Sequence, residues 1–494
     1  MEPFDLPGAS IAQAAAALTA GTVSAPELTA ELLARIERVD RGSVDLRSVL
    51  ETNPDAMTAA GALQEELART GPRGPLHGIP ILIKDNIDTA DSMLTTAGSL
   101  ALTGSRPARD AVAVRRLREA GAVLLGKTNL SEWANFRSTS STSGWSARGG
   151  QTRNPYVLDR SPCGSSSGSA AAVSAGLALA AIGTETDGSI VCPSAVCGVV
   201  GIKPTVGLVS QAGVIPISHS QDTVGVHARS VADAAAVLHV IAEPGPHQGD
   251  YARALKPDGL RGARIGVLRQ QFSGYSPGAD RLFNEALATF RSLGAELHDP
   301  AILPSADEIQ QSKAELTVLY YEFHADLDTY LAARADPTVR SLHDVVAFNR
   351  SHQREEMPYF AQEHFEAALE KGGLDEPEYL VARAECLRIG AHNGLDSALG
   401  GSDQLDALIA VTTGPAWTID HVNGDHVVGS SSEPAAMAGY PLITVPLGFV
   451  AGELPVGITF MGRAFSEALL IRLAYAFETA TRARRPPRFL ATLT

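Results

Sequence analysis

Two short loops rich in serine and glycine carry the side chains best suited to chemistry in this sequence. They lie at residues 164–168 and residues 186–189, and an apolar, small-residue run follows each of them. Glycine permits tight turns, and the start of a helix offers backbone N–H groups without partners. Ser189 beside consecutive backbone amides therefore suits a nucleophile next to an oxyanion hole, although an ordinary Gly/Ser turn has the same composition.

The first loop also matches the pattern G-x-S-x-G, with Gly164, Ser166 and Gly168. This pattern marks the nucleophile elbow of α/β-hydrolases, where a buried strand runs directly into the turn that carries the serine. Here the preceding residues 159–162 are Asp-Arg-Ser-Pro, which are polar and include a strand breaker. The sequence therefore disfavours an α/β-hydrolase with a Ser-His-acid triad.

A lysine closes an apolar run that is typical of a buried strand. Lys84 follows residues 79–83, and Asp85 comes directly after it. A lysine can act as a base only when it is neutral, so its pKa of about 10.4 must fall by roughly 3 units. Burial shifts the pKa in this direction. Asp85 would oppose the shift, but neighbouring side chains of a strand point to opposite faces of the sheet.

Taken together, these residues resemble the amidase signature family. Lys84 lies in a match to the family pattern G-x-P-x-x-x-K-D, Ser165 falls on the family's cis-serine, and Ser189 falls on the serine that becomes acylated. Further matches lie at residues 126–129, 201–205 and 454–457. The resemblance spans residues 10–482, and several ordered motifs at matching separations outweigh the ordinary roles of a strand-end lysine or a helix-capping serine.

The resemblance implies an amide hydrolase with a Ser-Ser-Lys triad. Lys84, Ser165 and Ser189 would be its catalytic residues, with a cis peptide bond at Ser165. The oxyanion hole would be formed by backbone N–H groups around Thr186, Asp187, Gly188 and Ser189. No cofactor and no metal are expected, since none of the 13 histidines stands in a ligand spacing such as H-E-x-x-H.

Within that family the sequence is most similar to the bacterial peptide amidases, which remove the C-terminal amide of peptides. Residues 135–138, 143–155 and 185–193 carry this likeness. Near the nucleophile the sequence departs from the commoner family text at Glu185, Asp187 and Val191, as the peptide amidases do. Many relatives have arginine at the position of Val191. An apolar side chain cannot pair with a substrate carboxylate, which disfavours a dicarboxylate-derived substrate.

The expected reaction is hydrolysis of a peptide C-terminal amide, with release of ammonia through an acyl-enzyme. One alternative is a broad-specificity aliphatic or aromatic amidase. A second is a transamidation subunit of an aminoacyl-tRNA amidotransferase, and a third is an inactive scaffold. The formal charge of −15 disfavours nucleic acid and anionic membranes as partners. A peptide or small-molecule amide is the expected partner, and the chain is expected to be a monomer or homodimer.

The elements that must position these residues indicate an α/β fold. Helical patterns alternate with short buried strands, which favours a large mixed, mostly parallel sheet sandwiched between helices. Residues 1–494 are expected to form one amidase domain with a signature core at 75–230. A helical insertion at 305–399 is expected to line the substrate side. Its aromatic residues favour a core role over a peptide groove. Strands are predicted at residues 79–83, 122–125, 179–182, 263–268, 408–411, 442–445 and 456–461.

Four cysteines in 494 residues are too few for a disulfide scaffold. Cys163, Cys192, Cys197 and Cys386 are therefore predicted to be buried thiols. No apolar run reaches the length of about 18 residues that a membrane helix needs. The N-terminal residues lack the basic and apolar regions of a signal peptide, which favours a cytoplasmic location, with secretion followed by processing as the alternative.

Overall fold

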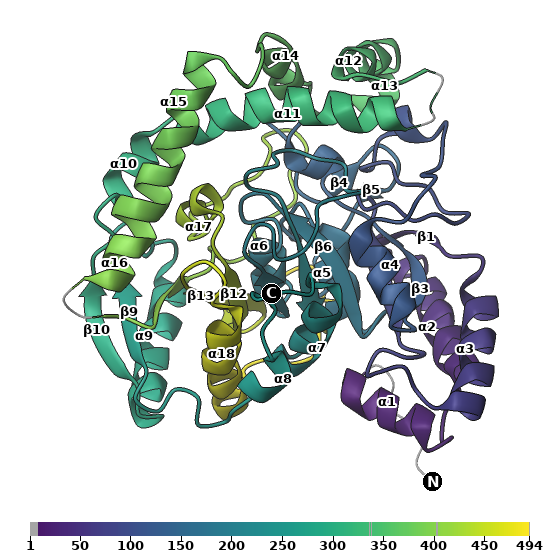
Figure 1. Cartoon of the computed structure of the whole chain (residues 1–494), viewed down its shortest axis with the longest axis horizontal. Coiled ribbons are helices and arrows are strands. Elements are labelled where there is room, and N and C mark those ends of the chain that lie inside the picture. The colour runs from purple at the N-terminus through teal and green to yellow at the C-terminus, as the bar shows by residue number, and fades with distance from the viewer. Residues whose placement is uncertain (1–7, 335, 337, 402–403, 494) are drawn as a thin grey trace.

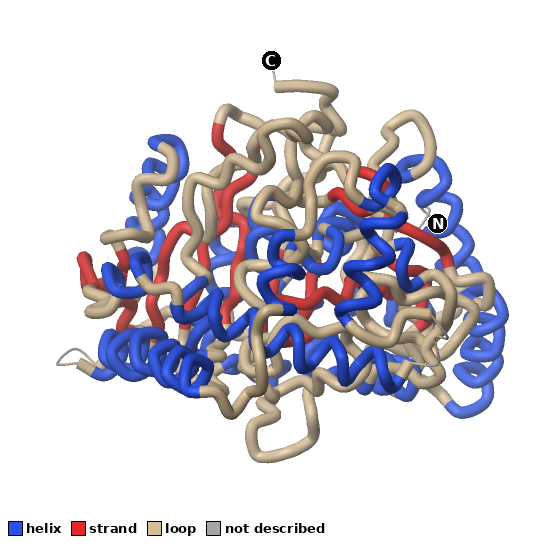
Figure 2. Tube along the Cα trace, turned by 90° about the horizontal axis from the view of Figure 1, so that it is seen from above, coloured by secondary structure: helices blue, strands red, loops and turns tan. Residues whose placement is uncertain are grey.

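A computed structural model describes residues 8–334, 336, 338–401 and 404–493 of the chain. Its centre is a sheet of 11 strands in the order β1-β3-β2-β6-β8-β7-β12-β13-β11-β9-β10. Figure 2 shows the strands crossing the middle of the molecule with helices outside them. The strands are β1 (Val49–Thr52), β2 (Pro80–Lys84), β3 (Val123–Thr128), β6 (Ala180–Glu185), β7 (Val200–Lys203), β8 (Thr223–Ala228), β9 (Arg264–Leu268), β10 (Glu296–Ala301), β11 (Ala407–Val411), β12 (Leu442–Val450) and β13 (Leu454–Met461).

The predicted mixed sheet is confirmed, but the expected majority of parallel pairs is not found. Among the described strands, four neighbouring pairs are parallel, β3-β2, β2-β6, β11-β9 and β9-β10. The other six pairs are antiparallel. A strand that is buried on both faces has the same apolar composition in either direction, so the sequence pattern does not reveal the direction of pairing. The strands β1, β7, β8 and β10 were not predicted.

Helices pack against the sheet and against one another outside it. One of them, α5, has all eight residues buried, because its small Ala, Ser and Gly side chains let it lie close to the strands. A Cβ atom at Gly168 would stand 2.3 Å from the carbonyl oxygen of Ser48, so this approach requires glycine. The helices outside the insertion are α1 (Ile11–Thr19), α2 (Ala25–Arg35), α3 (Ala56–Thr70), α4 (Val112–Glu119), α5 (Ser167–Ser174), α6 (Val191–Val196), α7 (Val231–Ile241), α8 (Tyr251–Ala254), α9 (Pro277–Ser292), α17 (Glu433–Ala438) and α18 (Glu467–Thr481).

A series of helices lies between β10 and β11, where the helical insertion was predicted. No strand occurs between these two among the described residues. Figure 1 shows α11 running across the top of the molecule and α15 along its left edge. The helices are α10 (Ala306–Gln311), α11 (Ala314–Ala333), α12 (Leu342–Ser351), α13 (Gln353–Glu356), α14 (Glu363–Leu369), α15 (Pro377–Cys386) and α16 (Ser397–Gly400).

The aromatic residues of this insertion mostly serve its core. Phe323 is fully buried and stacks on Phe365, with ring centroids 5.1 Å apart. Tyr321 is also buried, whereas 47% of Tyr359 is exposed. Most of these rings therefore stabilise the insertion and are not free to contact a ligand.

Several short segments complete the chain. The strands β4 (Trp145–Ser146) and β5 (Gly150–Gln151) form a separate two-stranded sheet. Within the described ranges, no helix has both the length and the apolar character that crossing a membrane would require. The remaining helical segments are η1 (Ile36–Asp40), η2 (Leu100–Leu102), η3 (Glu132–Asn135) and η4 (Leu387–Asp396).

Candidate active site

Three elements meet where the parallel strands β2 and β6 end at the same edge of the sheet. Lys84 is the last residue of β2, and β6 leads directly into residues 186–189. The two strands pair in parallel, with Ile83 opposite Ile182. Ser165 lies just before α5, and α5 packs against both strands. The sheet thus brings together two loops and a lysine that lie far apart in the sequence.

The amino group of Lys84 is fully buried and contacts Ser165 directly. Its Nζ atom lies 2.7 Å from Ser165 Oγ and 2.8 Å from the hydroxyl oxygen of Thr184. The carbonyl oxygen of Thr184 accepts a longer bond of 3.3 Å from the same nitrogen. Asn86 donates to the Thr184 hydroxyl at 3.0 Å, which fixes that hydroxyl beside the lysine. Among the described residues, the hydrogen-bond partners of Lys84 Nζ are therefore all neutral oxygens.

Burial lowers the pKa of Lys84 to about 7. The charges of Asp222 and Glu185 act in the opposite direction and raise this pKa, but the effect of burial is larger. A large fraction of the lysine is consequently neutral near pH 7, as a base at this position would require. The direction of the shift is the one that a base at this position requires.

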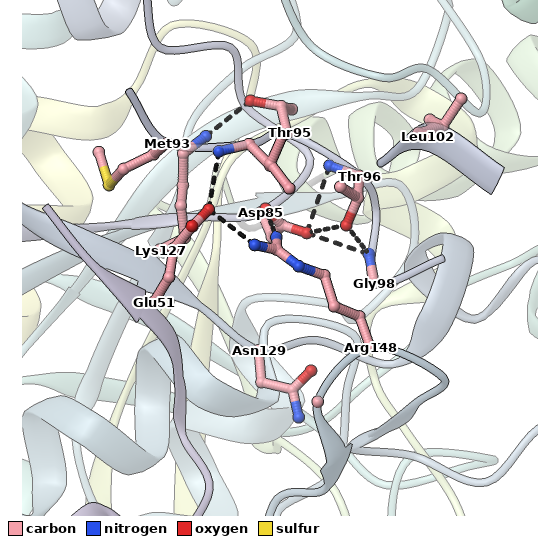
Figure 3. A network of polar contacts seen from close by, with 12 residues as sticks. Glu51, Asp85, Met93, Thr95, Thr96, Gly98, Leu102, Lys127, Asn129 and Arg148 are labelled. Atoms are coloured by element: carbon pink, nitrogen blue, oxygen red, sulfur yellow. Dashed lines mark hydrogen bonds and ion pairs between the residues drawn. The ribbon is translucent and has the colours of Figure 1, made fainter. Parts of the chain in front are cut away.

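Asp85 points away from the lysine, as predicted from the alternation of side chains along a strand. Its carboxylate accepts hydrogen bonds from Thr96 and from the backbone N–H of Gly98, and it forms an ion pair with Arg148 at 3.2 Å. Figure 3 shows these three partners gathered around the carboxylate. The negative charge of Asp85 is therefore paired with Arg148 and is directed away from Lys84.

The two serine loops are in contact. The peptide bond between Gly164 and Ser165 is cis, as the resemblance implied. The backbone N–H of Ser166 donates to the carbonyl oxygen of Ser189 at 3.1 Å, which joins the first loop to the second. Ser165 is fully buried, whereas 8% of Ser189 is exposed. Ser189 is thus the more exposed of these two buried serines.

The loop that carries Ser189 is shaped by Glu185. One oxygen of this buried carboxylate accepts from the N–H of Ile190 at 2.6 Å and of Val191 at 2.9 Å. Gly188 has a φ of +73°, which glycine adopts without strain. Across the described residues, no acceptor is found for the backbone N–H groups of Thr186, Asp187, Gly188 and Ser189. Consecutive unpaired N–H groups are the donors that an oxyanion hole needs.

Asp222 supports the same loop and was missed by the sequence analysis. Thr186 donates its hydroxyl to Asp222 Oδ1 at 2.6 Å, while the other carboxylate oxygen accepts from the N–H groups of Ile217 and Ser218. Burial raises the pKa of Asp222 to about 6. No local motif marks this residue, because its contact with Thr186 spans two neighbouring strands.

Carboxylates from the insertion and from α17 face this loop. Gln221 donates to Glu315 of α11 at 2.7 Å. Burial raises the pKa of Glu315 well above its usual range, and the charges of Asp187 and Glu433 raise it further. Burial and Asp187 likewise raise the pKa of Glu433 to about 7. The start of α11 thus lies near the loop that carries Ser189.

Cys163 and Cys192 form a disulfide, which corrects the prediction that all four cysteines are thiols. Cys197 and Cys386 are buried thiols as predicted. The two paired cysteines are 29 residues apart. Their pairing was not visible in the sequence because it depends on the contact between the two serine loops.

One cluster of histidine and carboxylates lies outside the serine loops. The ring nitrogens of His219 lie 2.9 Å from a carboxylate oxygen of Asp326 and 3.4 Å from one of Glu322. Tyr379 also donates to Glu322 at 2.7 Å. Both ring nitrogens already face carboxylates, and the hydrogen bond to Asp326 raises the pKa of His219. The cluster therefore acts as an ion-pair network that joins α11 to the loop before β8.

Comparison with known proteins identifies this chain as an amide-hydrolysing enzyme. The family model described as Amidase matches residues 27–471. The crystal structure of native peptide amidase from Stenotrophomonas maltophilia is 52% identical and superimposes with a TM-score of 0.93. That match covers 99% of this chain and 100% of the other.

More distant relatives are similar over nearly the whole chain. A probable amidase of Arabidopsis thaliana is 40% identical over 474 residues, which cover 92% of this chain and 87% of the relative. A glutamyl-tRNA(Gln) amidotransferase subunit of Myxococcus xanthus is 36% identical over 490 residues, covering 94% and 95%. The chain belongs to the amidase family, and its function is amide hydrolysis.

Proposed function

We propose that this enzyme removes the C-terminal amide of peptides and releases ammonia through an acyl-enzyme on Ser189. The observation that carries the proposal is the likeness to peptide amidase over the full length of both chains, at 52% identity. The direct contact between the buried Lys84 and Ser165, together with the hydrogen bond that joins the Ser165 loop to Ser189, supports the chemistry. The proposed catalytic residues are Lys84, Ser165 and Ser189.

The first half of the reaction needs a base, because a serine hydroxyl does not ionise near neutral pH. Neutral Lys84 accepts the proton of Ser165, and Ser165 takes the proton of Ser189. The Ser189 oxygen then attacks the amide carbonyl carbon. The proton returns through Ser165 to the nitrogen as the carbon–nitrogen bond breaks, so ammonia leaves and an ester of Ser189 remains. Such Ser–Lys arrangements are a known substitute for the histidine-based triad.

The second half uses the same groups on water. Ser165, with Lys84 as base, removes a proton from water, and the resulting oxygen attacks the ester carbonyl. The bond to Ser189 breaks, the serine regains its proton, and a peptide with a free carboxylate leaves. In both halves the unpaired N–H groups of Thr186, Asp187, Gly188 and Ser189 form the oxyanion hole. Each such donor is worth about 2.7–4 kcal/mol of the barrier in a preorganised site.

The substrate side of the site is formed in part by the helical insertion. The contact of Glu315 with Gln221 and its electrostatic interaction with Asp187 support this placement. Val191 is buried among apolar residues of the insertion and of the sheet. The apolar side chain of Val191 cannot pair with a substrate carboxylate, which supports a peptide amide over a dicarboxylate-derived amide. No cofactor or metal takes part in the proposed reaction.

We further propose that the enzyme acts alone, as a monomer or homodimer, on peptides or small amides. The formal charge of −15 disfavours an RNA substrate, although a similar protein is named as one subunit of a tRNA amidotransferase. The cytoplasmic location stays a prediction. The Cys163–Cys192 disulfide weighs against it, because the cytosol keeps most thiols reduced.

A substrate panel tests the proposed function. Purified enzyme is assayed for ammonia release from an amidated dipeptide, benzamide and propionamide, and for hydrolysis of the same dipeptide as its methyl ester. We expect the amidated dipeptide to have the highest kcat/KM among the amides, and Ser189→Ala to lose at least about 1,000-fold in kcat on it. A preference for benzamide or propionamide would favour the broad-specificity alternative. Substantial activity of Ser189→Ala would place the nucleophile elsewhere.

A further inference from the structure

The single disulfide of the described chain lies between the two serine loops. Cys163 precedes Ser165 by two residues, and Cys192 follows Ser189 by three. The Cα atoms of the two cysteines are 6.1 Å apart. Both residues are buried, with 5% of Cys163 and 7% of Cys192 exposed. A covalent link thus spans the site from just before one serine to just after the other.

The other contacts of each cysteine act within its own loop. The N–H of Cys163 donates to Ser161 at 3.1 Å, and its carbonyl oxygen accepts from the hydroxyl of Ser167 at 2.6 Å. The N–H of Cys192 donates to the carbonyl oxygen of Gly188 at 2.8 Å. These bonds shape each turn but do not set the distance between the two turns.

Weaker links also join the first loop to the second and to β6, which leads into it. Besides the bond from Ser166 to Ser189, the Ser166 hydroxyl donates to the carbonyl oxygen of Thr184 at 3.0 Å and accepts from its N–H at 3.3 Å. The sulfur of Cys197 lies 3.7 Å from the carbonyl oxygen of Pro162. Cys197 follows α6 directly, so this contact joins the far end of that helix to the segment before Cys163. A backbone hydrogen bond and a thiol contact yield more easily than a covalent bond. Among the described residues, the disulfide is therefore the one covalent constraint between the two loops that carry Ser165 and Ser189.

We propose that Cys163 and Cys192 are positioning residues whose disulfide holds Ser165 and Ser189 at the separation needed for proton transfer. This rests on the proposed function, in which the proton of Ser189 passes through Ser165. Proton transfer depends steeply on distance, and a misplacement of about 1 Å can cost about 100-fold in rate. The enzyme is then most active in its oxidised form, and its turnover responds to thiol reductants.

The redox step is an ordinary thiol–disulfide exchange. A dithiol reductant gives two electrons and two protons to the Cys163–Cys192 bond and closes to its own disulfide, leaving two cysteine thiols. Oxidised glutathione reverses the step by two exchanges and becomes two molecules of reduced glutathione. Neither step alters Lys84, Ser165 or Ser189 chemically. A change in kcat therefore reports how the two loops are positioned.

The first measurement counts thiols and does not depend on activity. The protein is incubated with oxidised glutathione, unfolded, and alkylated with iodoacetamide with or without prior reduction. Mass spectrometry is expected to find two alkylated cysteines, Cys197 and Cys386, without reduction and four after it. Four alkylated cysteines in the sample that was not reduced would show that the disulfide does not form, which overturns the proposal.

The second measurement compares kcat for the oxidised enzyme, the dithiol-reduced enzyme and the Cys163→Ala/Cys192→Ala variant. The control is Cys386→Ala, which removes a buried thiol in α15. We expect kcat to fall at least about 10-fold on reduction and in the double variant, with KM changed less than about threefold. Oxidised glutathione should restore the reduced enzyme but not the double variant. The control should keep the kcat and the response to reductant of the wild-type enzyme.

A purely structural disulfide would give a different result. Reduction would then lower the melting temperature but leave kcat of the folded enzyme within about twofold, and this outcome overturns the proposal. If the double variant does not fold, the comparison of oxidised with reduced wild-type enzyme still tests the proposal. Any amide that the enzyme hydrolyses serves as substrate, so an error in the proposed peptide specificity does not affect the result. An error in the proposed nucleophile shows separately, as activity of Ser189→Ala.

Discussion

The hydroxyl of Thr186 donates to the carboxylate of Asp222 at 2.6 Å, and the charge of that same carboxylate raises the pKa of Lys84. One buried carboxylate thus affects both the loop of the proposed oxyanion hole and the proposed base, Lys84. It holds the loop whose N–H groups would bind the oxyanion, and it limits how far burial lowers the basicity of the lysine.

Two variants separate these effects of Asp222. Asp222→Asn removes the charge, so the pKa of Lys84 should fall and the acid limb of the kcat/KM profile should move to lower pH. Thr186→Val removes the hydroxyl contact but leaves the charge, so the limb should stay in place while kcat falls by about 10-fold. A full pH–rate profile of each variant checks this. If the acid limb of the Asp222→Asn profile stays at the wild-type pH, the charge of Asp222 does not raise the pKa of Lys84.

The pH dependence of the wild-type enzyme follows from the need for neutral Lys84. Its pKa of about 7 predicts that kcat/KM rises about tenfold per pH unit below pH 7 and levels off above it. Lys84→Met should lose about 100- to 10,000-fold in activity, the usual contribution of a positioned base, and should lack this limb. If the residual activity of Lys84→Met keeps the same acid limb, that limb reports the titration of a group other than Lys84.

The buried lysine should also reduce stability. Its pKa is lower in the folded state than in the unfolded chain, so between about pH 7 and pH 10.4 the unfolded state binds more protons and stability rises with pH. A shift of roughly 3 units corresponds to about 4 kcal/mol. Lys84→Met should therefore raise the urea midpoint most at pH 7 and progressively less toward pH 10. An equal gain at both pH values would indicate better packing instead.

A buried ion pair near the insertion offers a stability test. Arg137 lies 3.0 Å from Glu132, with both side chains fully buried, and its guanidinium stands 4.3 Å from the ring of Phe360. Arg137→Ala leaves a buried carboxylate without its partner and should cost about 3–5 kcal/mol in urea unfolding. Arg115→Ala is the control, since Arg115 and Glu119 form an exposed pair worth at most about 1 kcal/mol. Equal losses in the two variants would contradict the role assigned to burial.

Much of the element pattern was predictable because its signals are local. The apolar run before Lys84 forms β2, and Ser24 and Glu27, which stand in the spacing of a capping box, form one at the start of α2. Strands such as β10 were missed because its exposed and polar residues do not alternate with apolar ones. Strand direction was misjudged because burial on both faces hides it.

For the site, the sequence determined which residues were candidates. Lys84, Ser165 and Ser189 stand in ordered motifs, and motif spacing is a property of the chain alone. Only the tertiary structure decided that Lys84 touches Ser165, that Asp222 holds Thr186, and that Cys163 is bonded to Cys192. The physical reason is that these contacts join segments which become neighbours only through the order of strands in the sheet. Burial, which lowers the pKa of the lysine, is likewise a property of the packed molecule.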